Sequence, residues 1–308
     1  MIEAHGLTKR YGDKLAVDDV TFTVQPGVVT GFLGPNGAGK STTMRMIIGL
    51  DAPTSGSVTV NGRSYREHRA PLHQVGALLE ARSIHTGRSA YNHLLALAQT
   101  SGIPRARVDE VIDVVGLPEV AGKRAGGFSL GMGQRLGLAT ALLGDPQTFV
   151  LDEPVNGLDP EGIRWIREML KDLAHQGRTV FVSSHLMSEM AQTAEHLIVI
   201  GRGRLIADMS VDRFIASASR SLVRVRTTDP DRLRSSLSGS DVTVTAVAGE
   251  ALEVAGLTSD QIGIAAAGAG ITLLELAPQQ ASLEEAFMDL TRDSVEFQGT
   301  LDTSGVGR

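Results

Sequence analysis

Short runs of consecutive apolar residues, most of them β-branched, recur along the first part of the chain with helical spacing between them. Runs of this kind are typical of strands buried in a parallel sheet that is covered on both faces. The helical pattern of residues 161–175 lies between two such runs, as in a β-α-β unit. The pattern therefore predicts an α/β domain over residues 1–218. The predicted strands are residues 28–33, 57–60, 148–151, 179–183 and 197–200, and the other helices are residues 40–49, 89–100 and 105–115.

The pattern changes after a short linker at residues 217–221, and residues 219–308 are predicted to form a small α+β accessory domain. Strands are predicted at residues 222–227, 242–247, 250–255 and 271–276, with helices at residues 229–238 and 258–267. This β-α-β-β-α-β order is the split β-α-β pattern of a ferredoxin-like fold. A last helix over residues 282–291 begins with Ser282 and Glu285, spaced as a capping box.

Composition narrows the class of protein. The chain has 308 residues, 42% of them hydrophobic, and no cysteine, which excludes disulfides, thiolate metal sites and a cysteine nucleophile. A net charge of −6 and an aromatic content of 4% argue against a nucleic-acid surface, so no nucleic-acid partner is expected. The longest apolar run, residues 262–277, contains Glu275 and is shorter than the ~20 residues of a membrane span. No leader is recognisable, and we expect a cytoplasmic protein.

Residues 34–41 match the pattern G-x-x-x-x-G-K-[ST], with a predicted strand before it and a helix after it. In such a loop the glycines let successive backbone N–H groups face one phosphate, and the helix N-terminus adds its dipole. Lys40 is predicted to reach the β- and γ-phosphates, and the Ser41 hydroxyl to ligate Mg²⁺. The predicted ATP-binding residues here are Gly34, Pro35, Asn36, Gly37, Ala38, Gly39, Lys40, Ser41 and Thr42.

The strand at residues 148–151 runs into Asp152 and Glu153. In a phosphate-loop fold an acid at a strand end holds Mg²⁺, a role that we predict for Asp152. Glu153 beside it can orient or deprotonate the attacking water. Asp-Glu-Pro is also ordinary turn chemistry, and the preceding phosphate loop is what favours the catalytic interpretation.

Residues 128–135, Phe-Ser-Leu-Gly-Met-Gly-Gln-Arg, resemble the signature motif of ATP-binding-cassette (ABC) proteins. Further matches follow the order of that family over about residues 2–215. Residues 156–159 resemble the D-loop, which ends at Asp159, and His185 resembles the switch histidine. Tyr11 resembles the aromatic residue that stacks on adenine.

The resemblance implies a P-loop NTPase fold of the ABC ATPase type, with a helical subdomain inserted at about residues 81–145. It also implies a head-to-tail homodimer that sandwiches two ATP molecules, in which Ser129 and Gly131 of one subunit close on the γ-phosphate held by the other. Glu153 would be the general base, and His185 would hold the γ-phosphate and water. Lys40 would complete the catalytic set.

The family usually has glutamine in the loop after residues 75–79, whereas this chain has Glu80. A carboxylate can ligate Mg²⁺, although it donates a hydrogen bond only when protonated. The same glutamate is found in the family branch that resembles bacitracin and daunorubicin exporters. That branch also has a C-terminal extension with a motif similar to residues 282–287. The other interpretation of Glu80 is a plain surface residue.

The resemblance thus implies the ATP-hydrolysing subunit of a drug or antibiotic exporter, bound to a separately encoded permease at the inner face of the membrane. The alternative is a non-transport ABC ATPase that acts on DNA or ribosomes. A third possibility makes the C-terminal domain a ligand-sensing module, since its fold by itself does not define a function. The apolar face of residues 282–291 is expected to be a packing surface, with a dimer or permease contact as the alternative. The remaining histidines show no metal-binding spacing.

Overall fold

The computed structural model describes residues 1–80, 84–218, 222–237, 242–247, 251–279 and 282–291. The chain divides into a first unit of Met1–Ser210, to which Thr291 also belongs, and a second unit of Val211–Leu290. The predicted boundary after residue 218 lies one helix further along the chain, because helix α7 (Val211–Ala218) groups with the second unit. Within the described residues no helix combines the length and the apolar character needed to cross a membrane.

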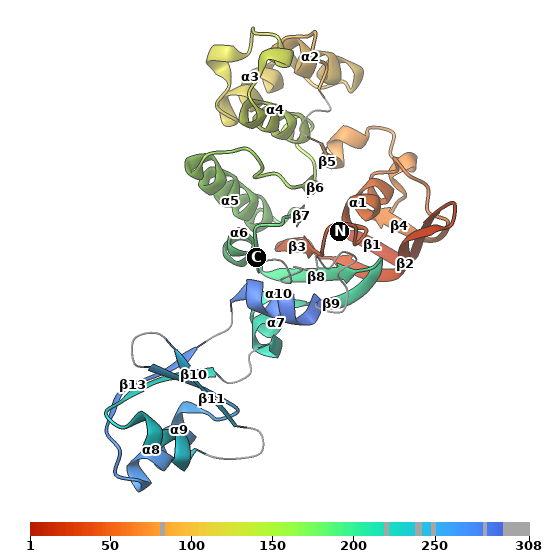
Figure 1. Cartoon of the computed structure of the whole chain (residues 1–308). Helices are drawn as coiled ribbons and strands as arrows, with labels where there is room; N and C mark the ends of the chain where they lie inside the picture. The colour runs from red at the N-terminus through yellow and green to blue at the C-terminus, as the bar shows by residue number, and fades with distance from the viewer. Residues whose placement is uncertain (81–83, 219–221, 238–241, 248–250, 280–281, 292–308) are drawn as a thin grey trace, which may run out of the picture. The chain divides into compact units, whose positions relative to one another are not determined.

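A six-stranded sheet forms the centre of the first unit (Figure 1). Its order is β5-β6-β7-β3-β8-β9, with the first five strands parallel and β9 antiparallel. Every residue of β3 and β7 is buried, as expected for continuous apolar runs. Sequence patterns did not indicate β5 or β9, the two edge strands. The strands are β3 (Val29–Leu33), β5 (Val75–Leu78), β6 (Thr148–Asp152), β7 (Thr179–Ser183), β8 (His196–Gly201) and β9 (Arg204–Ser210).

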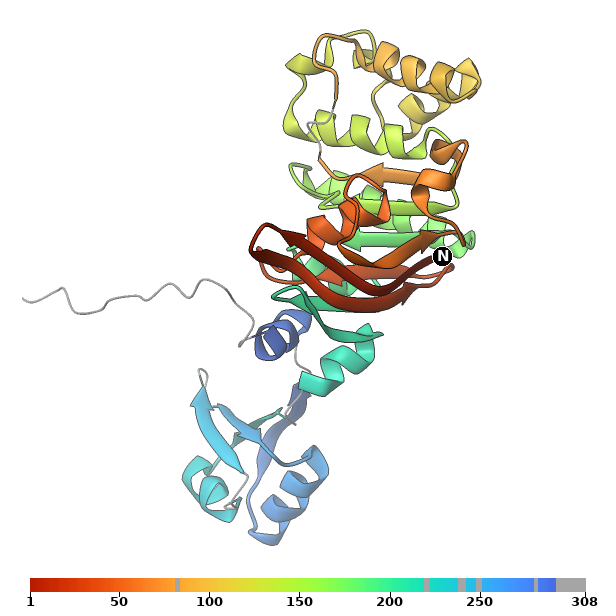
Figure 2. The same cartoon turned by 90° about the vertical axis from the view of Figure 1, so that its right-hand side faces the viewer.

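A second, antiparallel sheet has the order β2-β1-β4, with strands β1 (Ile2–Tyr11), β2 (Lys14–Val24) and β4 (Ser55–Val60). The strands β1 and β2 are the dark red pair in Figure 2. The sequence did not predict them, because bulges interrupt their alternation of buried and exposed residues. Helix α1 (Lys40–Ile47) packs against β2, β4 and β6, and so lies between the two sheets. Phe22, Phe32 and Phe181 fill the core beside it, with ring centroids 4.9–6.0 Å apart.

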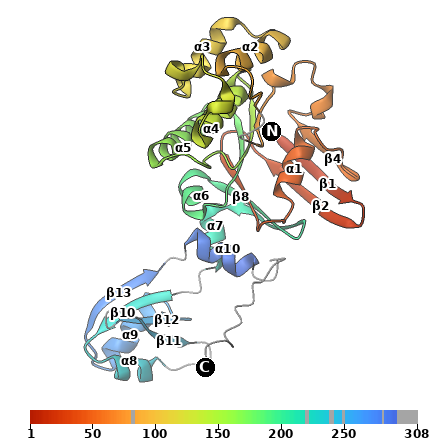
Figure 3. The ribbon, with the colours of Figure 1, turned by 45° about the horizontal axis from the view of Figure 1, so that its top comes forward.

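Helices α5 (Pro160–His175) and α6 (Met187–Thr193) cover the face of the central sheet opposite α1 (Figure 1). Three more helices, α2 (Ala90–Thr100), α3 (Arg105–Val114) and α4 (Leu130–Leu142), pack together, and α4 contacts β5 (Figures 1 and 3). They lie within the predicted helical subdomain. The short 3₁₀ helices are η1 (Tyr65–Glu67), η2 (Pro71–His73), η3 (Pro118–Val120) and η4 (Ala125–Gly127).

The second unit contains an antiparallel sheet of order β11-β12-β10-β13. Helices α8 and α9 bury Leu233 and Ile262 in one apolar cluster with Val223 and Val225 of β10. Strand and helix order match the predicted β-α-β-β-α-β pattern, so the ferredoxin-like fold is confirmed. The elements are β10 (Leu222–Thr227), α8 (Pro230–Ser236), β11 (Thr243–Val247), β12 (Ala251–Ala255), α9 (Ser259–Gly268), β13 (Leu273–Gln279) and α10 (Leu283–Thr291).

The predicted capping box precedes α10. Ser282 Oγ accepts from the Glu285 backbone N–H at 3.1 Å, and Glu285 Oε2 accepts from the Ser282 backbone N–H at 2.7 Å. Two backbone donors at the start of the helix are therefore satisfied reciprocally. Leu283 and Phe287 are buried and Leu290 is partly exposed, so the predicted apolar face is covered over only part of its length.

Candidate nucleotide-binding site

The loop between β3 and α1 leaves the start of the helix open to an anion. Gly39 is the N-cap residue, with φ 104°, and no side chain caps the first turn of α1. A Cβ atom on Gly39 would lie 2.5 Å from the Ala16 carbonyl oxygen, so only glycine fits at this position. The first backbone N–H groups of the helix, together with its dipole, are thus available to hold a phosphate group.

The Lys40 ammonium group lies against the loop that precedes it. Its Nζ donates to the carbonyl oxygens of Gly34 at 2.6 Å and Pro35 at 3.3 Å. Burial lowers the pKa of Lys40, while the charges of Glu153 and Asp152 act in the opposite direction. These two bonds fix the ammonium group beside the loop, and Lys40 lines the cavity described below.

Ser41 and Asp152 meet at the carboxyl end of β6. Ser41 Oγ donates to Asp152 Oδ2 at 2.7 Å, although 111 residues separate the two in the sequence. The other carboxylate oxygen, Oδ1, accepts a hydrogen bond from Ser183 Oγ. A hydroxyl and a carboxylate beside a phosphate-binding loop are oxygen ligands of the type that Mg²⁺ prefers. Within the described residues, no group of three or more His, Asp and Glu side chains could hold a metal.

Glu153 is held in an unusual backbone conformation, with φ 51°. Its backbone N–H donates to Ser183 at both Oγ (3.1 Å) and the carbonyl oxygen (3.2 Å). Its carbonyl oxygen accepts from Gln134 Nε2 at 2.9 Å. A non-glycine residue in this region is strained by about 1–3 kcal/mol, and such strain clusters at functional sites. These bonds fix where the Glu153 carboxylate points.

The Glu153 carboxylate is paired with His185. Its Oε2 accepts from the His185 backbone N–H at 3.2 Å and lies 2.7 Å from His185 Nδ1. Because a carboxylate only accepts hydrogen bonds, Nδ1 carries the proton and Nε2 is left to face another group. The predicted general base and the predicted switch histidine are therefore in direct contact.

Lys40, Ser41, Asp152 and Glu153 border one open cavity of about 490 Å³, which is large enough for a nucleotide, whereas His185 does not line it. Its lining residues are Tyr11, Lys14, Ala16, Pro35, Asn36, Gly37, Ala38, Gly39, Lys40, Ser41, Thr42, Asp152 and Glu153. The structure thus brings the predicted adenine-stacking residue, phosphate loop and acidic strand end together. Gly34, the first residue of the loop, does not line the cavity, and its carbonyl oxygen accepts a hydrogen bond from Lys40 Nζ.

Tyr11 lies at the edge of this cavity with 46% of its surface exposed. Its hydroxyl donates to Asp51 Oδ2 at 2.7 Å, and Lys9 Nζ lies 4.9 Å from the ring centroid. Burial and the bond to Asp51 raise the pKa of the Tyr11 phenol. Glu80, in contrast, is exposed after β5 and does not line the cavity. Its charge acts on Arg45 instead.

The signature residues form the start of α4 and do not line the cavity of their own chain. Ser129 is the N-cap residue, and its Oγ accepts from the Met132 backbone N–H at 3.2 Å. A Cβ atom on Gly131 would lie 2.7 Å from the Gly157 carbonyl oxygen. Asp159 caps α5, since its Oδ1 accepts from the Gly162 N–H at 2.9 Å. The signature loop and the predicted D-loop are thus packed against each other.

Sequence reasoning assigned no role to Ser183, Gln134 or Asp51. Gln134 lies within the signature motif, and Ser183 ends the predicted strand at residues 179–183. Only the fold shows that both side chains hydrogen-bond to the backbone of Glu153. Asp51 follows α1 in a polar loop, and nothing in the sequence pointed to its contact with Tyr11.

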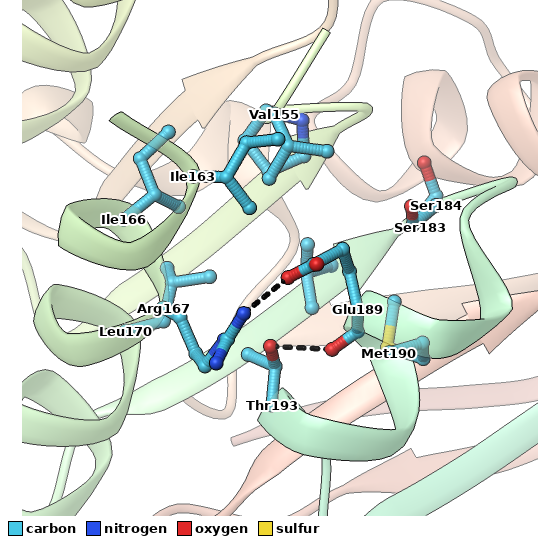
Figure 4. Close-up of a pocket in the computed structure, with 12 residues that line it drawn as sticks. Val155, Ile163, Ile166, Arg167, Leu170, Ser183, Ser184, Glu189, Met190 and Thr193 are labelled. Atoms are coloured by element: carbon cyan, nitrogen blue, oxygen red, sulfur yellow. Dashed lines mark hydrogen bonds and ion pairs between the residues drawn. The ribbon is translucent and has the colours of Figure 1, made fainter. Parts of the chain in front are cut away.

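A second cavity lies behind the acidic strand end, between α5, α6 and β7 (Figure 4). It measures about 20 Å³, room for one water molecule at most. Its walls are mainly apolar, with Ile163, Ile166 and Leu170 on α5. Arg167 forms an ion pair with Glu189 across it at 2.6 Å. This cavity is a small gap in the packing of α5 and α6 against β7, and it is too small to hold a nucleotide.

A parallel sheet with a glycine-rich loop at the N-terminus of α1, and an acid at the end of a neighbouring strand, defines a P-loop nucleotide-binding protein. Residues 17–156 match the family described as "ABC transporter". Residues 221–284 match a "Domain of unknown function (DUF8746)".

The chain is 41% identical to the bacitracin transport ATP-binding protein BcrA of Bacillus licheniformis, over 69% of this chain and 70% of that protein. It is 34% identical to the Nod factor export ATP-binding protein I of Burkholderia lata, over 94% of this chain and 96% of that protein. A solved ATP-binding subunit of an ABC transporter superposes with a TM-score of 0.65, at 26% identity, over 70% of this chain and 92% of that one. The chain belongs to the ATP-binding proteins of ABC transporters, and the predicted family and fold are confirmed.

Proposed function

We propose that the chain hydrolyses ATP, with Mg²⁺, as the motor subunit of an exporter. The observation that carries the proposal is the arrangement of two pairs at the end of β6. Ser41 contacts Asp152 at 2.7 Å, and Glu153 contacts His185 at 2.7 Å. The pair proposed to hold the metal, Ser41 and Asp152, therefore lies next to the pair that contains the proposed general base, Glu153 and His185. Family membership and the names of the relatives support the same conclusion.

Lys40 and the first-turn amides of α1 would hold the phosphates, and Ser41 and Asp152 would hold the metal. When bound, Mg²⁺ neutralises phosphate charge. Glu153 accepts a proton from the water that attacks the γ-phosphorus, while the bond from the γ-phosphorus to the bridging oxygen breaks and ADP leaves. His185 donates from Nδ1 to Glu153, which leaves Nε2 to contact the γ-phosphate. Tyr11 stacks on the adenine. This assignment leaves Ser129, Gly131 and Asp159 outside the cavity of their own chain.

The position of the signature residues supports a second copy as a partner. The N-terminus of α4 is a natural binding point for a phosphate group, yet it does not border the cavity within one chain. In a head-to-tail homodimer Ser129 and Gly131 complete the site of the other subunit. ATP then acts as the link between the subunits, and hydrolysis releases them.

A separately encoded permease binds this chain at the inner face of the membrane. BcrA is named for bacitracin transport and the Burkholderia protein for Nod factor export, which supports an antibiotic or similar amphiphile as the cargo. In this proposal the transported molecule is bound by the permease and not by this chain.

Glu153→Gln tests the proposal directly. It keeps the shape of the side chain but cannot accept the proton, so phosphate release is expected to fall by about 10²–10⁴-fold while ATP binding is retained. Lys40→Ala is expected to lose ATP binding itself. Glu119→Gln makes the same chemical change at an exposed position of η3 and is the matched control. Wild-type hydrolysis by Glu153→Gln would contradict the proposal.

A further inference from the structure

The Tyr11 hydroxyl is tied to the segment that follows helix α1. It donates to Asp51 Oδ2 at 2.7 Å, and Asp51 lies just after the helix. Tyr11 is the last residue of β1, so this bond joins the antiparallel sheet to the segment that follows the helix of the phosphate loop.

Asp51 is itself held in place. Arg45, in the last turn of α1, donates from Nε to the same oxygen, Oδ2, at 2.9 Å. The Asp51 side chain is only 18% exposed, and the bonds from Arg45 and Tyr11 lower the pKa of its carboxyl. A carboxylate that accepts a charged and a neutral donor at one oxygen is more strongly oriented than one with a single partner.

Lys9 restricts the ring from another direction. Its ammonium lies over the ring at 4.9 Å from the centroid and donates to the carbonyl oxygen of Ala52 at 2.6 Å. With this cation on one face, the opposite face of the ring is the one left for a base. The ring is exposed, so without these contacts it would be free to change rotamer.

We propose that Asp51, oriented by Arg45, is a positioning residue that fixes the Tyr11 ring relative to α1, so that the base platform and the phosphate loop form one rigid unit. The proposal rests on the proposed function, in which Tyr11 stacks on adenine. It makes Asp51 a determinant of how strongly the protein prefers a purine nucleotide to phosphate alone. An ion pair that only stabilised the end of α1 would affect both ligands equally.

The test compares ADP with inorganic pyrophosphate, each with Mg²⁺, by calorimetric titration of the full chain. Asp51→Ala is expected to raise the Kd of ADP by about three- to tenfold and to change the Kd of pyrophosphate by less than about twofold. Asp51→Asn keeps an acceptor oxygen at this position and should recover part of the ADP affinity. Asp13→Ala removes the same charge at an exposed position two residues from Tyr11 and should leave both affinities unchanged.

Tyr11→Phe keeps the ring and removes only the hydroxyl. It should reproduce the loss in ADP affinity of Asp51→Ala, and combining the two changes should add nothing further. Equal weakening of ADP and pyrophosphate by Asp51→Ala would overturn the inference, as would an unchanged Kd of ADP. If Tyr11→Ala also leaves the Kd of ADP unchanged, the adenine platform of the proposed function is wrong. If Tyr11→Ala weakens ADP while Asp51→Ala does not, only the positioning role is wrong.

Discussion

His185 Nδ1 lies 2.7 Å from Glu153 Oε2, and the His185 backbone N–H donates to the same oxygen at 3.2 Å. One carboxylate oxygen therefore receives two bonds from one residue. The arrangement couples the loop after β7 to the proposed general base, Glu153, at the end of β6. It also fixes the histidine tautomer, because the carboxylate can only accept.

His185→Ala should lower the rate of ATP hydrolysis by about 10²-fold, since it removes both the orientation of Glu153 and the group that we propose to face the γ-phosphate. ATP affinity should change little. Because the two residues act as a pair, Glu153→Gln combined with His185→Ala should be no slower than Glu153→Gln alone. Single-turnover phosphate release measures all three variants, and strictly additive losses would show that the residues act independently.

Ser183→Ala should destabilise the acidic strand end. Ser183 Oγ donates to Asp152 Oδ1 and accepts from the Glu153 N–H, so both groups lose a partner. The free energy of unfolding should fall by about 1–3 kcal/mol, and the Mg²⁺ concentration that half-saturates hydrolysis should rise. Ser188→Ala, an exposed serine on α6, is the control for both urea unfolding and metal titration. A change in stability without one in metal dependence would limit Ser183 to a structural role.

Gly131→Ala and Lys40→Ala together test the head-to-tail dimer. Gly131 does not line the cavity of its own chain, so Gly131→Ala should bind ADP normally and hydrolyse ATP poorly. Each variant alone should be inactive as a homodimer. When the two are mixed, one site of the heterodimer combines an intact phosphate loop with an intact signature, and partial hydrolysis should return. An inactive mixture that still forms heterodimers would contradict a composite site.

His93 should make the protein less stable at acid pH. Its side chain, on α2, is 8% exposed, and burial lowers its pKa, with Arg88 and His85 adding to the effect. The unfolded chain therefore takes up a proton before the folded chain does. The stability that depends on neutral His93 is present above pH ~6.5 and is lost as the pH falls towards the folded pKa.

His93→Gln cannot take up this proton. Between pH 7 and 5, urea unfolding of the wild type should lose stability faster than the variant, by at most about 1.4 kcal/mol per pH unit. His175→Gln, at an exposed position at the end of α5, should keep the wild-type pH dependence. Identical slopes for His93→Gln and the wild type would show that the imidazole does not contribute.

The sequence by itself determined those features of this protein whose residues all lie in one short stretch of the chain. Residues 34–41 carry the phosphate loop in one stretch, because its function depends on successive backbone N–H groups. The buried strands β3, β6, β7 and β8 were recognisable, since continuous apolar runs need no information from elsewhere in the chain. The accessory unit was recognisable from the order of its strands and helices alone.

Only the tertiary structure decided which distant groups meet. Strands β1 and β2 depend on partners and bulges that no local pattern encodes. Ser183 became the support of Asp152 and Glu153 because β6 and β7 are neighbours in register, with Asp152 opposite Ser183. Asp51 and Tyr11 stand 40 residues apart, and the turn after α1 brings them into contact. The physical reason is common to all three cases: a hydrogen bond between distant residues depends on the packing of whole elements, which a short sequence pattern does not contain.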